Sequence, residues 1–178
     1  GLYGPAAGVP DLEKAIKFYR QAAEAGSAVS QYNLGSCYMN GDGVEEDLVK
    51  AKVWSAKAAK QGHAKAMNYL ACVLQVMEGR AALPSMSLLV RAAAEKGHAN
   101  ARKNLPRLEE DIRRQCGQCG KDLRGATPPP SVCGGCGGVA YCSKKCAKKH
   151  WKKGGHKQAC KAAKQYLPEE EEGRKSIE

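Results

Sequence analysis

The sequence predicts an all-α helical-repeat solenoid followed by a small zinc-stabilised finger with little regular structure. Three observations lead to this prediction. The first hundred residues repeat at a step of 36 and then 35 residues. Seven of the nine cysteines fall between Cys116 and Cys160. The composition is rich in Ala, with only 6% aromatic residues, which suits closely packed helices more than sheet.

The repeat indicates stacked pairs of helices. Apolar residues within one unit recur at three- and four-residue steps, which is helical spacing. A glycine closes one helix of each unit and the next helix begins two residues later, while residues 40–43 supply a turn. Repeats of this length stack into solenoids. Equivalent residues are Leu12, Leu48 and Leu83; Phe18, Trp54 and Leu89, expected to fill the gaps between units; Ala22, Ala58 and Ala93; and Gly26, Gly62 and Gly97.

One unit carries a distinctive set of residues: Leu34, Gly35, Tyr38, Gly41, Gly43, Val44, Asp47, Lys50, Ala51, Trp54, Ala58, Ala59 and Gly62. Through them the unit resembles the Sel-one-like repeat, a relative of the tetratricopeptide repeat. Tyr3, Gly8 and Val9 repeat part of that unit 35 residues earlier, so we expect the chain to begin inside an incomplete unit. About two and a half units are present where about three are needed for stability. We therefore expect this chain to be the C-terminal piece of a longer solenoid.

Four segments are expected along the chain. Residues 1–106 are the repeats, and Pro106 is expected to interrupt the last repeat helix. Residues 107–115 are a linker or closing helix, and residues 116–160 are the finger. Residues 161–178 are a charged tail, expected to be disordered because it includes four consecutive Glu and little apolar surface.

The cysteine cluster has the spacing of zinc ligands. CxxC turns aim two thiolates at one point, and ligands separated by three residues lie one helical turn apart. Zinc prefers four such ligands, so eight ligands fill two structural sites and leave no open position for catalysis. The ligand pattern is Cys116-x2-Cys119, Cys133-x2-Cys136, Cys142-x3-Cys146 and His156-x3-Cys160.

The cluster also resembles the MYND zinc finger, through Tyr141-Cys142-Ser143, Cys146, Trp151, His156 and Cys160. That family interleaves its sites. The resemblance implies one zinc on Cys116, Cys119, Cys142 and Cys146, and the other on Cys133, Cys136, His156 and Cys160. His150 competes with His156 as the eighth ligand; we prefer His156 because its spacing to Cys160 is helical.

The resemblance further implies a function in protein interaction. MYND fingers bind short proline-rich peptides through a groove that includes the Trp, here Trp151, although a wholly structural role for Trp151 is the alternative. Ala147 stands where the family usually has a groove Gln. Helical repeat arrays offer a second binding surface. We expect a scaffold or adaptor that docks protein partners, proline-rich peptides among them.

Two other functions are also compatible with the sequence. Residues 116–166 hold 11 Lys or Arg against one acid, Asp122, a charge that attracts nucleic acid, although Lys dominates and aromatics are few. The chain also suits a non-catalytic part of a larger enzyme or ligase assembly. We expect no enzyme and no small-molecule substrate, since the sequence shows no phosphate-binding loop or nucleophile–base pair.

The sequence also favours a reducing compartment. Nine cysteines is an odd number, and CxxC pairs among lysines without a secretory signal favour metal over disulfides. No apolar run approaches the roughly 20 residues that span a bilayer. We therefore expect a cytoplasmic or nuclear protein that makes no membrane contact.

Overall fold

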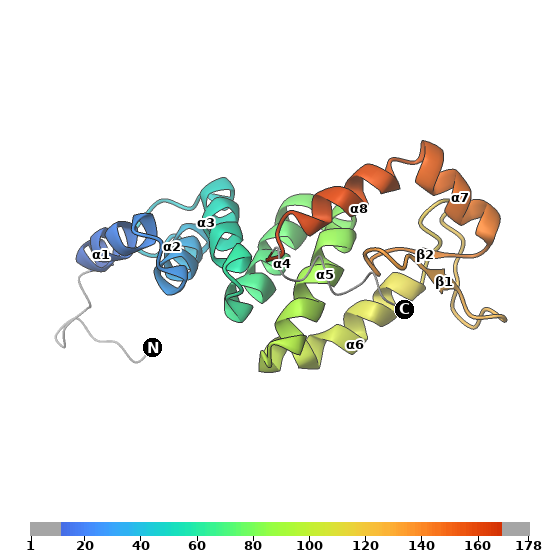
Figure 1. Ribbon diagram of the computed structural model, residues 1–178, viewed down its shortest axis with the longest axis horizontal. Coiled ribbons are helices and arrows are strands. Elements are labelled where there is room, and N and C mark those ends of the chain that lie inside the picture. The colour runs from blue at the N-terminus through green and yellow to red at the C-terminus, as the bar shows by residue number, and fades with distance from the viewer. Residues whose placement is uncertain (1–11, 169–178) are drawn as a thin grey trace.

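The computed structural model describes residues 12–168, and its helices stack side by side in chain order (Figure 1). Each helix packs chiefly on the helices before and after it. The predicted helical solenoid is therefore confirmed. The repeat region contains α1 (Leu12–Glu24), α2 (Ala28–Asn40), α3 (Leu48–Lys60), α4 (Ala64–Glu78), the short 3₁₀ helix η1 (Gly79–Ala82), α5 (Leu83–Glu95) and α6 (Ala99–Arg113).

The finger has little regular structure, as predicted. Its two strands, β1 (Ser131–Val132) and β2 (Ala140–Tyr141), pair antiparallel with Ser131 opposite Tyr141. Two short helices follow, α7 (Lys144–Lys153) and α8 (His156–Lys164). In Figure 1, α8 extends back from the finger over the last repeat helices, and it packs against α5.

The repeat turns combine a glycine with a capping residue. Gly62 and Gly97 have φ of 83° and 86°, a conformation that glycine adopts without steric cost. The next residue, His63 or His98, accepts a hydrogen bond through Nδ1 from the backbone N–H three residues later. Ser27 makes the same bond after Gly26. These side chains satisfy a helix N-terminal donor, which explains why each helix begins there.

The repeat core is built on small residues. Ala51, Ala58 and Ala93 are fully buried and let neighbouring helices approach closely. The three predicted gap-filling residues behave differently along the array. Leu89 is fully buried and Trp54 is half-buried under Lys57, but Phe18 is 69% exposed. The prediction for Phe18 is therefore wrong, because α2 is the helix that α1 mainly contacts among the described residues.

Pro106 does not end the last repeat helix. α6 runs without interruption from Ala99 to Arg113 with Pro106 inside it. An interior proline costs about 3 kcal/mol in a helix. Nearby, Ile112 is buried, and Leu105 and Leu108 pack partly buried against the cores. Full burial of one aliphatic side chain contributes roughly 1.5–3 kcal/mol, and the partly buried leucines add to this. Packing therefore outweighs the local preference.

The folded chain also continues past the expected end of the finger. α8 passes through Cys160 to Lys164, and Tyr166 and Leu167 pack against the repeat core. The first part of the expected tail therefore belongs to the folded unit, because its apolar residues have a surface to cover. Residues 169–178, and the expected incomplete unit with Tyr3, Gly8 and Val9, lie outside the described residues.

The finger and the last repeat share a core. Leu88 of α5 clusters with Cys136, Cys160 and Ala163, and Ile112 of α6 clusters with residues of β2. Gly138 lies against the repeats so closely that a Cβ at this position would clash with the carbonyl group of Leu83. Only a glycine allows the finger loop to sit this near to the start of α5.

Candidate zinc sites and peptide groove

The first candidate metal site joins a loop, a strand end and a helix. Cys116 and Cys119 lie in the turn after α6, Cys142 follows β2, and Cys146 lies in the first turn of α7. Their four Sγ atoms all lie within 4.8 Å of one another. The Cys119–Cys142 and Cys142–Cys146 Sγ separations are 3.7 and 3.5 Å. Tetrahedral zinc, with Zn–S bonds of about 2.3 Å, places its sulfurs about 3.8 Å apart, so these residues fit the ion.

The second site lies deeper, between the finger and α5. It gathers Cys133, Cys136, His156 and Cys160, again with ligand atoms within 4.8 Å of one another. His156 Nε2 lies 3.7 Å from Cys136 Sγ, and both residues are buried. The Gly138 N–H donates a hydrogen bond to Cys136 Sγ at 3.4 Å. Hydrogen bonds of this kind orient a metal ligand toward its ion.

In each site one cysteine has a lowered pKa and so favours the thiolate, the form that binds zinc. Burial opposes ionisation of Cys116, but backbone N–H groups of Cys142, Cys119 and Gln118 lower its pKa to about 6. The side chains of Cys136 and His156 lower the pKa of Cys133 well below its usual value. The paired Cys136 has a raised pKa, because the Cys133 thiolate and burial both oppose its charge. Each site therefore carries negative charge that a cation neutralises.

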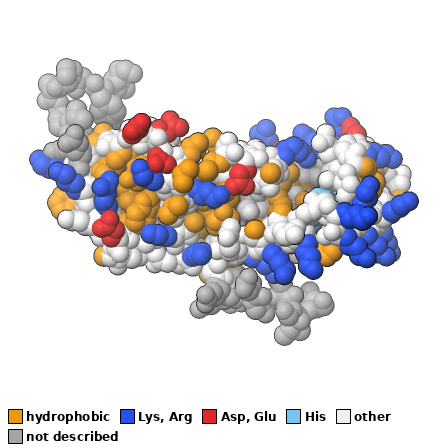
Figure 2. Space-filling view, turned by 90° about the horizontal axis from the view of Figure 1, so that it is seen from above, with side chains coloured by type: hydrophobic (Ala, Val, Ile, Leu, Met, Phe, Trp, Pro, Cys, Tyr) orange, Lys and Arg blue, Asp and Glu red, His pale blue; other side chains and the backbone are white. Residues whose placement is uncertain are grey.

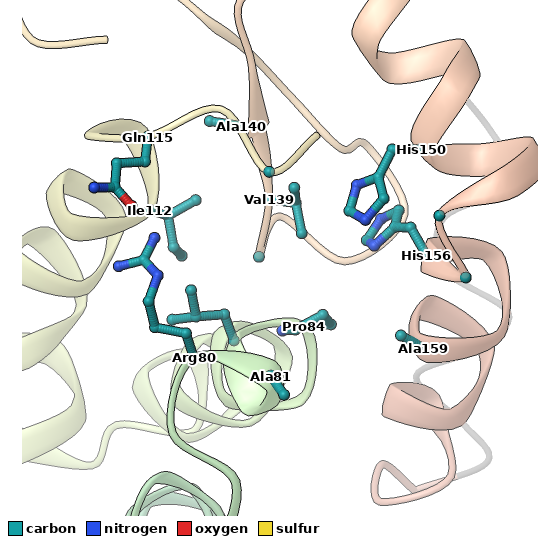
Figure 3. Close-up of a pocket in the computed structure, with 15 residues that line it drawn as sticks. Arg80, Ala81, Pro84, Ile112, Gln115, Val139, Ala140, His150, His156 and Ala159 are labelled. Atoms are coloured by element: carbon teal, nitrogen blue, oxygen red, sulfur yellow. The ribbon is translucent and has the colours of Figure 1, made fainter. Parts of the chain in front are cut away.

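His150 lies beside the second site without joining its four ligands. Its ring stacks on His156 with centroids 5.1 Å apart, and its Nδ1 lies 3.3 Å from the Tyr141 hydroxyl. Both histidines line a cavity of about 420 Å³ at the junction of finger and repeats, with Arg80 and Gln115 on the opposite side (Figure 3). The structure thus groups His156 with the cysteines and places His150 against Tyr141.

Trp151 lies at the surface of the finger. Its side chain is 42% exposed and lines a groove of about 320 Å³ between α7 and the β-strands. Most of the groove surface is apolar, contributed by Val132, Tyr141, Ala147 and Trp151. Ala147 offers no hydrogen-bonding side chain, so the polar side chains of the groove come from residues at its edges, such as Ser131, Lys148 and Lys152. The full lining is Ser131, Val132, Cys133, Tyr141, Ala147, Lys148, Trp151 and Lys152.

Basic side chains gather at the finger end of the molecule, where Figure 2 shows blue side chains with little red. None of the residues of α7 is fully buried. Its lysines are all exposed: Lys144, Lys145, Lys148, Lys149, Lys152 and Lys153. Among the described residues, no helix is long and apolar enough to cross a membrane.

Comparison with known families matches both parts of the chain. The Sel1 repeat model matches residues 1–27 and 28–63, and the MYND finger model matches residues 116–160. The helix pair formed by α4 and α5 continues the array beyond the matched repeats. With the two ligand groups in place, the finger holds two structural zinc ions.

Two curated relatives resemble part of the chain. The DAP3-binding cell death enhancer 1 of Rattus norvegicus is 37% identical over 66 residues, which cover 37% of this chain and 13% of the relative. The exopolysaccharide production negative regulator of Rhizobium meliloti is 37% identical over 73 residues, which cover 40% of this chain and 27% of the relative. The matches thus span only a small part of each relative's length.

Proposed function

We propose that this chain, which carries Sel1 repeats and a MYND finger, is a docking adaptor whose finger binds proline-rich segments of protein partners. The observation that carries this proposal is the exposed, largely apolar groove at Trp151. Aromatic-lined grooves of this kind suit the preformed polyproline II conformation. The rat relative is named for binding another protein, which supports an interaction function.

The zinc ions have a structural part in this proposal. One ion is assigned to Cys116, Cys119, Cys142 and Cys146, and the other to Cys133, Cys136, His156 and Cys160. Four protein ligands leave no position for a water nucleophile or a substrate, so no catalytic step is assigned to the metal. The ions instead fix the strands and α7 that form the two walls of the groove.

Zinc counting tests the ligand assignment. We expect native mass spectrometry to find two zinc ions in the protein and in the His150→Ala variant. His156→Ala should lose the second ion or bind it far more weakly, because its Nε2 faces Cys136. Loss of zinc in His150→Ala with full occupancy in His156→Ala would reverse the assignment.

A peptide titration tests the groove. The full chain with zinc is titrated with a fluorescein-labelled peptide containing three prolines and a leucine between neutral Gln residues, and anisotropy is followed. Trp151→Ala should weaken binding by roughly 30-fold or more, the size of an interface hot spot. Phe18→Ala removes an exposed aromatic side chain from the repeats and should leave binding unchanged. Equal affinities for the two variants would refute the groove.

Nucleic-acid binding is the second candidate, favoured by the exposed lysines of α7. A short duplex should then bind with an affinity that falls steeply as salt rises, and it should bind the Trp151→Ala variant equally well. A part in a larger enzyme or ligase assembly also remains a proposal, to be tested by isolating the full-length protein with its partners.

A further inference from the structure

We infer that the groove at Trp151 selects proline-rich peptides with acidic residues beside the prolines, and that it disfavours a second copy of this chain. This inference rests on the proposed function. It specifies the charge that a docked partner must carry, which the apolar groove alone does not specify.

The rim of the groove is positive on its helical side. Lys148 and Lys152 line the groove, and they lie one helical turn apart with Trp151 between them in sequence. Lys144 continues the same stripe one turn earlier. All three are exposed, so an acidic peptide can reach them without displacing other side chains.

No acidic residue of the finger neutralises this rim. Within residues 12–168, no lysine of α7 forms an ion pair. Asp122, the acid of the finger, is held by Arg124, whose Nε donates to the carboxylate at 2.9 Å. Residues 123–168 contain no Asp or Glu at all. Among the described residues the rim therefore has no acidic partner, and a ligand can supply the complementary charge.

The geometry limits where that charge lies. From Lys144 to Lys152 the helix rises about 12 Å, at 1.5 Å per residue. A polyproline II peptide advances about 3.1 Å per residue, so about four residues span the stripe. We therefore expect one or two Asp or Glu within about four residues of the docked prolines.

The chain carries its own proline run beside the groove, and this run lacks acids that could pair with the rim. Pro128 and Pro129 are exposed and lead directly into Ser131 and Val132 of the groove wall. Between Arg124, which is paired with Asp122, and Lys144, the segment that holds the run contains no charged residue. The run of a second copy would therefore bring no negative charge to the lysine rim, which disfavours it relative to an acidic peptide.

The test uses the full chain with zinc and three labelled peptides. Each has the same core of three prolines and a leucine, flanked by four Glu, four Gln or four Lys. We expect the Glu peptide to bind about 10-fold more tightly than the Gln peptide at low salt, and the Lys peptide more weakly than both. The preference should shrink as salt rises, because these charges are exposed.

Two double variants locate the effect. Lys148→Gln with Lys152→Gln should bring the Glu and Gln peptides to similar affinity. Lys65→Gln with Lys103→Gln removes the same charge from exposed positions on α4 and α6 and should keep the preference. Two bound zinc ions and an unchanged circular dichroism spectrum establish that each variant is folded.

The outcomes separate this inference from the proposed function. Equal binding of the Glu and Gln peptides to the unmodified chain would overturn the charge selection and leave the groove intact. Failure of all three peptides would overturn both. Glu-peptide binding that survives Trp151→Ala would show charge attraction without the groove and overturn the inference. The same holds if a short duplex displaces the Glu peptide at a lower concentration than the Gln peptide does.

The second copy is tested by sedimentation. Concentration-dependent dimers that Pro129→Ala abolishes would overturn discrimination against a second copy.

Discussion

The repeats and the finger are stabilised in different ways, although they form one continuous structure. In the repeats, fully buried aliphatic side chains such as Leu34, Leu70 and Leu89 fill the space between helices. In the finger, none of the residues of α7 is fully buried, and the core includes metal ligands such as Cys136 and Cys160. A helical array can be stabilised by packing alone, whereas a module this small needs its metal. The shared core at α5 is where the two forms of stability meet.

Zinc removal should have the largest effect and should divide the molecule. Structural zinc contributes on the order of 10 kcal/mol per site in finger peptides, so a chelator should unfold residues 116–160. We expect circular dichroism to retain most of the helical signal and hydrogen exchange to rise throughout the finger. Exchange should also rise in α5, because Leu88 loses its contacts with Cys136 and Cys160, while α2 and α3 stay protected. A metal-free finger that kept its slow exchange would contradict this division.

Truncation of a buried aliphatic should have the next largest effect, and on the repeats. Leu89→Ala should lower the free energy of unfolding by about 2–5 kcal/mol, because the side chain is fully buried. Phe18→Ala at the equivalent repeat position should change it by no more than about 0.5 kcal/mol, because Phe18 is 69% exposed. Urea denaturation followed by circular dichroism measures both values. Similar losses for the two variants would mean that α1 has a packing partner in solution.

A methyl group at the junction should weaken the joint between the two regions. Gly138→Ala places Cβ against the Leu83 carbonyl and Pro84, and overpacking of this kind costs about 1–3 kcal/mol. Gly134→Ala is the matched control, since its Cβ would meet open space. We expect a lower thermal midpoint and faster proteolysis between α6 and the finger for Gly138→Ala alone. Identical midpoints for the two variants would show that the junction is looser than the structure indicates.

The smallest expected effect concerns the histidine cap of α4. Burial, with the charges of Lys65 and His98, lowers the pKa of His63, and the neutral Nδ1 accepts the Ala66 N–H. Because the folded state holds the lower pKa, this stability is fully present above the unfolded pKa of about 6.5 and is lost as pH falls through the folded value. His63→Asn keeps a cap that does not titrate. Between pH 7.5 and 5, the original protein should lose about 1 kcal/mol relative to the variant in urea unfolding.

Several features needed the structure because local and tertiary forces compete. Pro106 favours a helix end by itself, and the packing of Leu108 and Ile112 decides otherwise. The histidines after the repeat glycines could be recognised as repeat features, but their capping bonds depend on the backbone they meet. The groove at Trp151 was expected from a family resemblance, while the lysines on its rim are adjacent to it only because α7 is a helix.

The sequence by itself determined the helical repeats and the cysteine pattern from which the zinc ligands are predicted. Helical periodicity and ligand spacing are local, so they can be read without knowing what surrounds them. Only the tertiary structure decided that Tyr166 and Leu167 cover the repeat core, that Phe18 lies exposed, and that the finger shares a core with α5. Those outcomes depend on which surfaces meet across long separations in sequence. Phe18 and Leu89 occupy equivalent positions of the repeat, but only Leu89 is covered by neighbouring helices. The repeat pattern alone therefore does not determine which of the two side chains is buried.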